Sequence, residues 1–449
     1  MTNVIKLKQG LDIALKGKPE EKMINSAQSE YFVMIPDNFD GVTPKVVVKE
    51  GDRVMAGTPL MFDKKHPEIK FVSPVSGEVT AVDRGERRKV LGIYVRKDAE
   101  TSYVEFGKKD VAKMSGEEVK ETLLNAGVWP FIKQRPYDVV ADPTVAPRDI
   151  FVTAFDSAPL APNFDFVAKS EQANIQVAID ALKKLTKGKV YVGVRPGSAI
   201  KIQGAEVVTF EGAHPAGNAG VQAHNIKPVN KGETIWTVSA FDLIIMGRVF
   251  TKGVADFERI IAITGSEIKT PAYVKALPGT MLRSLVNDNV TKGEGSLRYI
   301  SGNVLTGTNE GEEGYLGFYH SQMTVIPDGS DVHEFVGWAM PGFNKYSASN
   351  TYFTKLLGKA KEYTIDARLR GGRRALIVSG DFEKVMPMDI YTEFLFKAIL
   401  AFDIDKMENL GIYEIAPEDF ALCEFIDVSK TEMQKTIRMG LDRLQKEMN

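Results

Sequence analysis

The sequence is poor in the side chains that hold metals and redox groups. Its 449 residues include one cysteine, Cys423, and five histidines. A single thiol excludes internal disulfide bonds, cysteine-ligated iron–sulfur clusters and cysteine-built zinc sites, because each of these needs two to four sulfur ligands. No histidine lies in an HExxH motif, so the sequence also lacks the common zinc-protease signature.

Long apolar runs and an excess of charge are absent as well. The longest apolar run, residues 394–402, contains Lys397 and is too short to cross a bilayer. The N-terminus has no apolar signal core, which favours a cytoplasmic location. The formal net charge of -2 gives no global basic field, so nucleic acid is not an expected partner.

The usual nucleotide and nucleophile motifs, GxGxxG, GxxxxGK[ST] and GxSxG, are also missing. A different glycine-rich loop, EGAHPAGNAG at residues 211–220, follows a predicted strand. Glycine loops after parallel strands bind ligands through their backbone N–H groups. The loop therefore predicts a ligand site, whose candidate residues are His214, Gly217, Gly220 and His224.

The first hundred residues contain an arm and a pair of hairpins. Residues 1–22 carry five lysines, which favours either a solvated edge strand or an arm that docks on a partner. In residues 23–105, the stretch 46–82 alternates short strand patterns with glycine turns. This stretch resembles the barrel-sandwich hybrid fold of lipoyl carriers, in which a lysine at a hairpin tip holds the prosthetic group. A carrier modified at Lys64 is therefore one alternative interpretation.

Residues 106–253 alternate predicted strands and helices. Ser115 and Glu118 predict a capping box at the start of a helix that Gly127 ends. Apolar runs predict strands at residues 149–153, 190–194, 205–210 and 243–247. Strand–helix alternation with apolar strands predicts a parallel sheet in a Rossmann-like α/β domain.

The last two segments differ from the first ones. Residues 254–330 show a strand–turn–strand pattern followed by a short helix, which resembles a soluble-ligand-binding β-grasp (SLBB-like) domain. Residues 331–449 predict a helical domain, with an apolar helix at 387–401 and a terminal helix with one apolar stripe. The predicted fold class is multi-domain α+β, with four domains after the arm.

The segment at residues 417–428 resembles a ferredoxin-type CxxCxxCxxxCP run. Its slots fall at Pro417, Phe420, Cys423, Asp427 and Val428. One thiolate is left where a cluster needs four ligands. The helical domain thus resembles a ferredoxin-type domain without its clusters.

The domain order, the sequence IKLKQGLD at residues 5–12, the glycine loop and the tail without cluster ligands together resemble one family. This is the NqrA family, whose members belong to Na(+)-translocating NADH:quinone oxidoreductases, the Nqr complexes; the RnfC protein of the Rnf complex and the flavin-binding protein of respiratory complex I are similar. The resemblance implies a peripheral subunit, on the cytoplasmic side of the bacterial inner membrane, of a complex that couples NADH oxidation and quinone reduction to Na(+) export.

The resemblance also implies partners and cofactors. The partners are the other Nqr proteins (NqrB, NqrC, NqrD, NqrE and NqrF), chiefly the membrane protein NqrB, and the flavins, iron–sulfur centre and NADH site are expected in those partners. This chain would hold no tightly bound cofactor, metal or catalytic residue, and would contribute to quinone binding near His214, Gly217, Gly220 and His224. The docking arm would use Lys6, Lys8, Gly10, Leu11 and Asp12. A soluble flavin- or nucleotide-binding oxidoreductase that uses residues 212–220 is the alternative.

Overall fold

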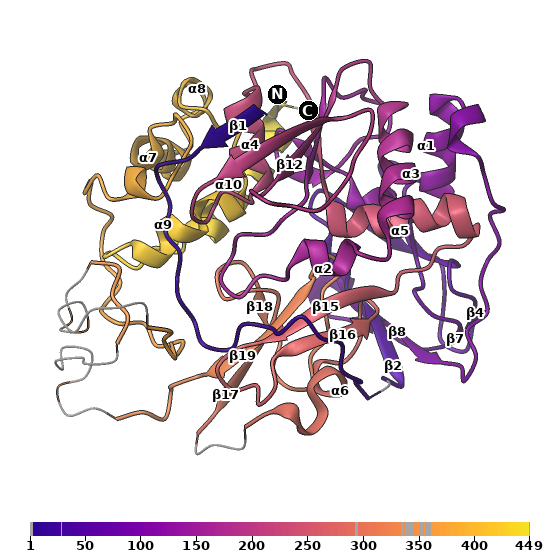
Figure 1. Cartoon of the computed structure of the whole chain (residues 1–449), viewed down its shortest axis with the longest axis horizontal. Helices are drawn as coiled ribbons and strands as arrows, with labels where there is room; N and C mark the ends of the chain where they lie inside the picture. The colour runs from indigo at the N-terminus through magenta and orange to yellow at the C-terminus, as the bar shows by residue number, and fades with distance from the viewer. Residues whose placement is uncertain are drawn as a thin grey trace.

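A computed structural model describes residues 3–27, 29–291, 295–333, 336, 345–349, 352, 354 and 361–448. The chain builds an α/β domain with a seven-stranded sheet, a barrel-sandwich hybrid of two small sheets, a five-stranded β-grasp domain and a helical C-terminal region (Figure 1). The predicted multi-domain α+β architecture is confirmed at this level.

The seven-stranded sheet forms the centre of the α/β domain. Its strands, in spatial order, are β1 (Asn3–Lys6), β13 (Glu206–Glu211), β12 (Val190–Val194), β11 (Ile150–Thr153), β14 (Ile235–Ser239), β9 (Lys133–Arg135) and β10 (Val139–Val140). The first five are parallel, and β9 and β10 are antiparallel. Its helices are α1 (Gly116–Asn125), α2 (Phe164–Ala168), α3 (Gln172–Lys183), α4 (Ala219–Ile226) and α5 (Ala240–Lys252). The capping box of Ser115 and Glu118 is present at α1.

The predicted strand at residues 243–247 is wrong, because this run lies inside helix α5. A short run of consecutive apolar residues does not distinguish a buried strand from a buried helix. Here Ser239 caps the helix N-terminus through its side chain, and Gly253 ends it in the left-handed conformation. The sheet strand is β14, the segment immediately before the helix.

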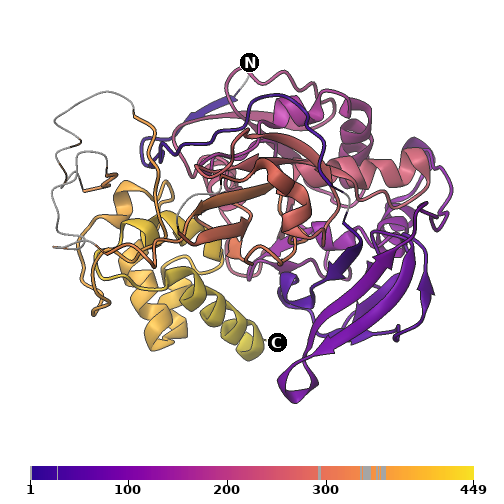
Figure 2. The ribbon, with the colours of Figure 1, turned by 90° about the horizontal axis from the view of Figure 1, so that it is seen from below.

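The N-terminal arm is part of the fold and not a free appendage. Its first strand, β1, pairs in parallel with β13 at the edge of the large sheet. The following residues run across the front of the molecule to the β-grasp domain (Figures 1 and 2). Ile13 and Leu15 are buried, and Met23 forms a bridge with Tyr273. The arm therefore connects domains that are distant in sequence.

The barrel-sandwich hybrid consists of two antiparallel sheets. One contains β2 (Tyr31–Met34), β8 (Val90–Lys97), β7 (Gly77–Arg84) and β4 (Arg53–Val54), and the other β3 (Pro44–Val46), β5 (Pro59–Asp63) and β6 (Lys70–Val72). The β7–β8 hairpin projects from the molecule (Figure 2). Lys64 lies exposed in the turn between β5 and β6, so its predicted place at a hairpin tip is confirmed.

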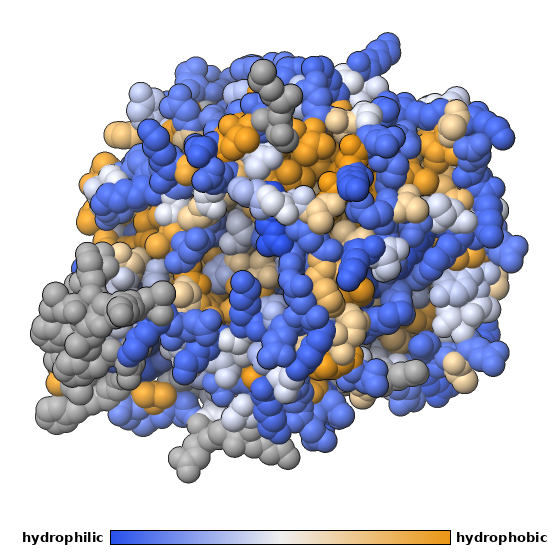
Figure 3. Space-filling model, viewed as in Figure 1, coloured by the Kyte–Doolittle hydropathy of each residue, from blue (hydrophilic) through white to orange (hydrophobic). Residues whose placement is uncertain are grey.

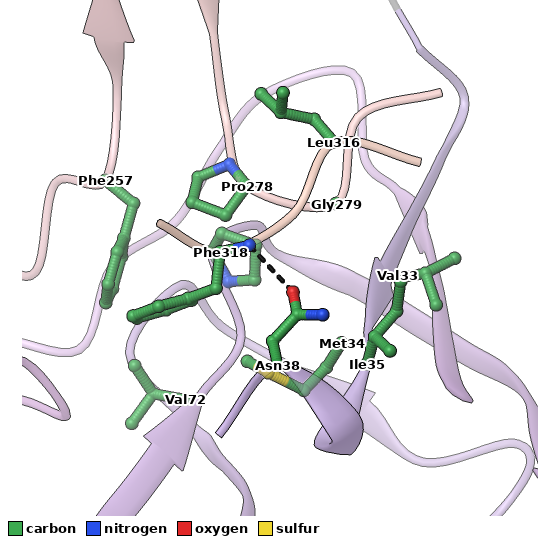
Figure 4. A pocket seen from close by; sticks show the side chains of 11 residues that line it. Val33, Met34, Ile35, Asn38, Val72, Phe257, Pro278, Gly279, Leu316 and Phe318 are labelled. Carbon is green, nitrogen blue, oxygen red and sulfur yellow. Dashed lines mark hydrogen bonds between the residues drawn. The ribbon is translucent and has the colours of Figure 1, made fainter. Parts of the chain in front are cut away.

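The β-grasp domain packs against the barrel-sandwich hybrid. Its strands are β16 (Ala272–Ala276), β15 (Arg259–Thr264), β19 (Gln322–Pro327), β17 (Leu297–Ser301) and β18 (Thr308–Asn309), with helix α6 (Leu282–Val286). At the seam, the backbone N–H of Phe318 donates to Asn38 Oδ1 over 2.8 Å (Figure 4). The apolar cavity there measures about 10 Å³, enough for no more than one water molecule. The seam is thus a domain contact without room for a ligand.

The C-terminal region contains α7 (Thr392–Ala401), α8 (Ile404–Asn409), α9 (Ala421–Ile426) and α10 (Met433–Met448). The spacing predicts a buried stripe of Met433, Ile437, Leu441, Leu444 and Met448 on α10, and the first four are fully buried, whereas Met448 at the end of the helix is exposed. Helix α7 begins five residues later than the predicted apolar helix at 387–401. None of the helices in the described residues is both long and apolar enough to cross a membrane.

Candidate functional site

The candidate site lies where parallel strands of the large sheet end. Asp12 follows β1, Ser157 follows β11 and His214 follows β13, so all three come from the carboxyl edge of the sheet. Side chains from separate strands converge at this edge because parallel strands share one direction. The predicted glycine loop thus occupies the expected position.

His214 forms the centre of this site. Its Nδ1 lies 3.0 Å from Ser157 Oγ, and that oxygen accepts the N–H of Gly217 over 2.8 Å. The serine hydroxyl has no other acceptor among the described residues, so we assign it as the donor to Nδ1. This places the imidazole proton on Nε2, which is buried without any partner in the described structure. The site therefore presents one unused N–H donor.

The N-terminal arm closes the loop from one side. Asp12 Oδ1 accepts the N–H of His214 over 2.9 Å, and the N–H of Leu11 donates to the His214 carbonyl over 2.8 Å. Gly10 lies so close that a Cβ there would approach this carbonyl to 2.5 Å. Only 4% of His214 is exposed, and burial lowers its pKa to about 4. The imidazole is therefore neutral at neutral pH.

Gly217 serves close packing and not an open approach to a ligand. A Cβ at this position would lie 2.7 Å from the backbone nitrogen of Ser157. Its carbonyl accepts the Thr153 hydroxyl over 2.8 Å. Within the predicted set, Gly217 and His214 are thus held together through Ser157.

Gly220 belongs to a different place, the joint with the C-terminal region. Arg135 of β9 donates to Asp419 Oδ2 over 2.8 Å and to the carbonyl of Glu414, and both charged side chains are almost fully buried. A Cβ on Gly220 would lie 2.5 Å from the Arg135 guanidinium and from Asp419 Oδ2. Glycine is required here because helix α4 passes directly over this ion pair.

His224 is part of the same joint. Its Nε2 accepts the N–H of Asp389 over 2.9 Å, so its Nδ1 carries the proton and donates to Glu414 Oε2 over 2.8 Å. Both ring nitrogens are occupied by the C-terminal region. The structure thus separates the four predicted residues into two pairs, and His224 has no free nitrogen for a substrate.

Sequence reasoning missed the charged groups of this joint. Arg135, Asp138 and Asp419 are spread over nearly 300 residues, and nothing in a sequence distinguishes a buried arginine from a surface one. Burial by itself would raise the pKa of Asp138, but Lys133, Arg135 and Arg438 hold it below its usual value. The available signal is the adjacent acidic pair Glu418 and Asp419 at the start of the tail frame.

Among the slots of the tail frame, Cys423 is the one residue with a thiol that a cluster could use. Phe420 and Cys423 are fully buried, and burial raises the pKa of the Cys423 thiol. Asp427 accepts the N–H groups of Ser429 and Thr431 over 2.9 and 2.8 Å. No cluster of three or more metal-binding side chains occurs in the part of the chain that the structure describes. This donor set does not fit an iron–sulfur cluster.

Comparison with known proteins shows relatives along the whole chain. Family models match residues 5–98 (NqrA N-terminal barrel-sandwich hybrid domain), 114–255 (NqrA second alpha/beta domain) and 260–310 (NQRA C-terminal domain, of SLBB type). The NqrA proteins of the Na(+)-translocating NADH-quinone reductases from Photorhabdus laumondii and Hahella chejuensis are 33% and 34% identical to it, over 99% of this chain and 100% of theirs. The chain belongs to the NqrA family.

A solved NAD+-reducing [NiFe]-hydrogenase is similar over 51% of this chain and 52% of its own, at 11% identity and a TM-score of 0.33. That likeness is too weak to establish a shared fold. The chain is therefore part of a Na(+)-translocating NADH-quinone reductase on the strength of its full-length relatives, and the family implies further Nqr proteins as partners.

This NqrA chain uses the predicted docking-arm residues in two ways. Gly10, Leu11 and Asp12 face the glycine loop of the same chain, as described above. Lys6 and Lys8 are exposed, and Lys6 pairs with Glu211 over 3.0 Å. The side chains of Lys6 and Lys8 are thus available to another protein of the complex, and Asp12 is exposed as well although its Oδ1 binds the N–H of His214.

Proposed function

We propose that this chain is the redox-silent, peripheral member of its reductase, held on the cytoplasmic side by the membrane protein NqrB. The observation that carries this proposal is the tail frame, in which Phe420 and Asp427 fill slots that a cluster would need. Electrons then pass through flavins and iron–sulfur centres of the other Nqr proteins. Family membership disfavours the alternative, a free-standing flavin- or nucleotide-binding oxidoreductase.

The absence of a bound redox group is tested on the purified chain. Its visible absorption spectrum and its iron content are measured after purification without added cofactors. We expect no flavin band and less than about one iron per ten chains, since four soft ligands are needed for a cluster. A stoichiometric flavin or iron signal would overturn this part of the proposal.

Docking on NqrB is tested in the assembled complex. Co-expression of all Nqr proteins, with and without NqrB, is followed by isolation through a tag on this chain. We expect the remaining proteins to be recovered with the chain only when NqrB is present. Equal recovery of the others without NqrB would show that a different partner holds the chain.

A contribution to quinone binding is a second candidate function, and the unpaired Nε2–H of His214 favours it. A buried donor without an acceptor costs about 1–3 kcal/mol, and a quinone carbonyl would provide the missing acceptor. Ser157 fixes the orientation of this donor through Nδ1. Because the imidazole of His214 is neutral, it would orient the quinone ring through a hydrogen bond and would not place a positive charge beside it.

The quinone proposal is tested by calorimetric titration with a short-chain ubiquinone. His214→Gln is expected to weaken binding about tenfold, which corresponds to the loss of one hydrogen bond. His224→Gln is the matched control, since both nitrogens of His224 are occupied within the chain. Equal affinities of wild type and His214→Gln, or no binding by the wild type, would remove this role.

A further inference from the structure

Helix α7 is apolar on its outer side as well as on its inner side. Leu395, Phe396 and Ile399 face the core and are at most 4% exposed. Phe394 and Leu400 face outward with 54% and 56% of their surface exposed, and Figure 3 shows apolar side chains at the edge of the molecule where α7 lies. Large exposed apolar side chains at neighbouring positions are typical of an interaction surface. Among the described residues, none covers Phe394 and Leu400 on the outer side of α7.

An extended segment beside α7 lacks backbone partners. Arg374 N–H donates to Ser429 on one side of it, and on the other the N–H groups of Ser379 and Gly380 each donate to the buried carboxylate of Glu393 over 2.9 Å. Between these anchors, the N–H and C=O groups of residues 376–378 form no hydrogen bond with the described part of the chain.

The side chains of this segment are those of a strand. Ile377 and Val378 are exposed by 53% and 52%, and β-branched residues favour extended backbone. Since Glu393 lies in the first turn of α7, its hydrogen bonds to Ser379 and Gly380 hold the segment beside the start of that helix. We call the exposed apolar residues of the segment and the helix, namely residues 376–378, Tyr391, Phe394 and Leu400, the α7 face.

The charges around the α7 face indicate the chemistry of its partner. Residues 367–380 contain four arginines, whereas the acidic residues Asp366, Asp381, Glu383 and Asp389 lie on either side of this stretch. Arg373 pairs with Glu432, Arg368 and Arg370 share Asp366, and Arg374 is exposed. Lys397 is exposed on the outer side of α7, between Phe394 and Leu400. The exposed cations beside the apolar residues, Arg374 and Lys397, are complementary to acidic residues that flank an apolar strand of a partner.

Unpaired backbone distinguishes a protein partner from a lipid surface. Exposed N–H and C=O groups are costly in contact with hydrocarbon, because lipid offers no hydrogen bonds to them. An added strand, in contrast, pairs these groups and places alternate side chains on the apolar face. The backbone of residues 376–378 therefore favours a peptide segment over a membrane.

We propose that the α7 face binds an extended, apolar segment with acidic flanks from another protein of the reductase, which pairs with residues 376–378 as an added strand. The proposal rests on the assignment of this chain to the reductase complex. It assigns a docking role to a surface separate from Lys6 and Lys8 of the arm.

Hydrogen exchange tests the strand addition directly. The amides of Leu376, Ile377 and Val378 are compared in the isolated chain and in the assembled complex. We expect fast exchange in the isolated chain and at least about tenfold slower exchange in the complex, as for other paired strands. If the chain copurifies with its partners while these amides still exchange fast, the α7 face is not the docking surface. Failure to copurify would instead contradict the assignment to the complex.

Substitutions test the apolar part and the nature of the partner. Phe394→Ser and Leu400→Ser should lower recovery of the assembled complex several-fold, whereas Leu91→Ser, at an exposed position of the β7–β8 hairpin, should not. The melting temperature of each isolated variant confirms that it folds. Recovery at the wild-type level for both α7 variants would overturn the proposal. Slower exchange of the 376–378 amides on phosphatidylglycerol vesicles alone would do so as well, in favour of a lipid surface.

Discussion

The segment from Gly212 to His224 has two ends that look alike in sequence and differ in structure. At the first end, His214 is neutral, and one buried ring nitrogen has no partner in the part of the chain that the structure describes. At the second end, Gly220 and His224 contact Arg135, Glu414 and Asp419, whose polar groups bind one another across two domains. A glycine loop at a sheet edge can therefore enclose a neutral imidazole at one end and support a neighbouring domain at the other.

Among the predicted changes, removal of Asp419 at the second end should cause the largest loss of stability. Asp419→Ala removes the buried carboxylate at 2.8 Å from the Arg135 guanidinium and leaves that guanidinium with Glu418 Oε1 at 3.3 Å, which costs about 3–5 kcal/mol of unfolding free energy. Urea denaturation followed by circular dichroism measures the loss. The double variant Arg135→Met with Asp419→Leu should recover most of it, because apolar residues of similar volume replace both charges. A loss below about 1 kcal/mol in the single variant would contradict a buried clamp.

A side chain at Gly220 should separate the domains by a smaller amount. Gly220→Ala places a methyl group 2.5 Å from the guanidinium and the carboxylate, so α4 or the C-terminal region must shift. We expect a loss of about 1–3 kcal/mol and faster proteolysis between the α/β domain and the helical region. Gly372→Ala is the control, since no atom lies within 4 Å of its added Cβ. Equal stability of the two variants would show that α4 does not press on the ion pair.

At the first end, the buried His214 should make the free energy of unfolding depend on pH. Burial lowers the pKa of His214 from 6.5 to about 4. Below pH 6.5 the unfolded chain therefore binds a proton at this imidazole, whereas the folded chain does not bind it until the pH approaches 4. The stabilisation is complete above pH 6.5 and is lost as the pH falls toward 4, by up to about 3 kcal/mol. His214→Gln should flatten this part of the stability curve, whereas His66→Gln, at a partly exposed position, serves as the control for loss of an imidazole. Parallel curves for wild type and His214→Gln would contradict a buried neutral His214.

Local sequence patterns predict several of the helices and strands, and they fail where a pattern fits both kinds of element. The capping box at Ser115, the strands beginning at Ile150 and Val190 and the stripe on α10 follow from spacing alone. The strand prediction at 243–247 is wrong because hydrophobicity is the same for a buried strand and a buried helix, and only the cap at Ser239 separates them.

The candidate site is predictable in position but not in its partners. A glycine loop after a parallel strand predicts the sheet edge, and His214 lies there. The partners of its far end, Arg135 and Asp419, lie 85 residues before and 199 residues after Gly220. Such pairs arise from domain packing, which no local pattern in one sequence specifies. The arm is likewise recognisable as a lysine-rich strand, but its contact with His214 depends on Asp12 reaching across the sheet edge.

The smallest effect on stability is expected from Lys6 and Lys8 on the outer side of the arm. Their substitution can therefore test docking without a change in folding. Lys6 pairs with Glu211 while 72% and 50% of the two side chains remain exposed, so the pair contributes at most about 1 kcal/mol. Lys6→Ala combined with Lys8→Ala should leave the melting temperature unchanged, in contrast to Asp12→Ala, which removes the acceptor of the His214 N–H. If the lysines dock on NqrB, the double variant loses recovery in the complex, and this loss grows with salt because exposed charges are screened. Wild-type recovery at high and low salt would assign the arm to folding alone and leave docking to other surfaces, such as the α7 face.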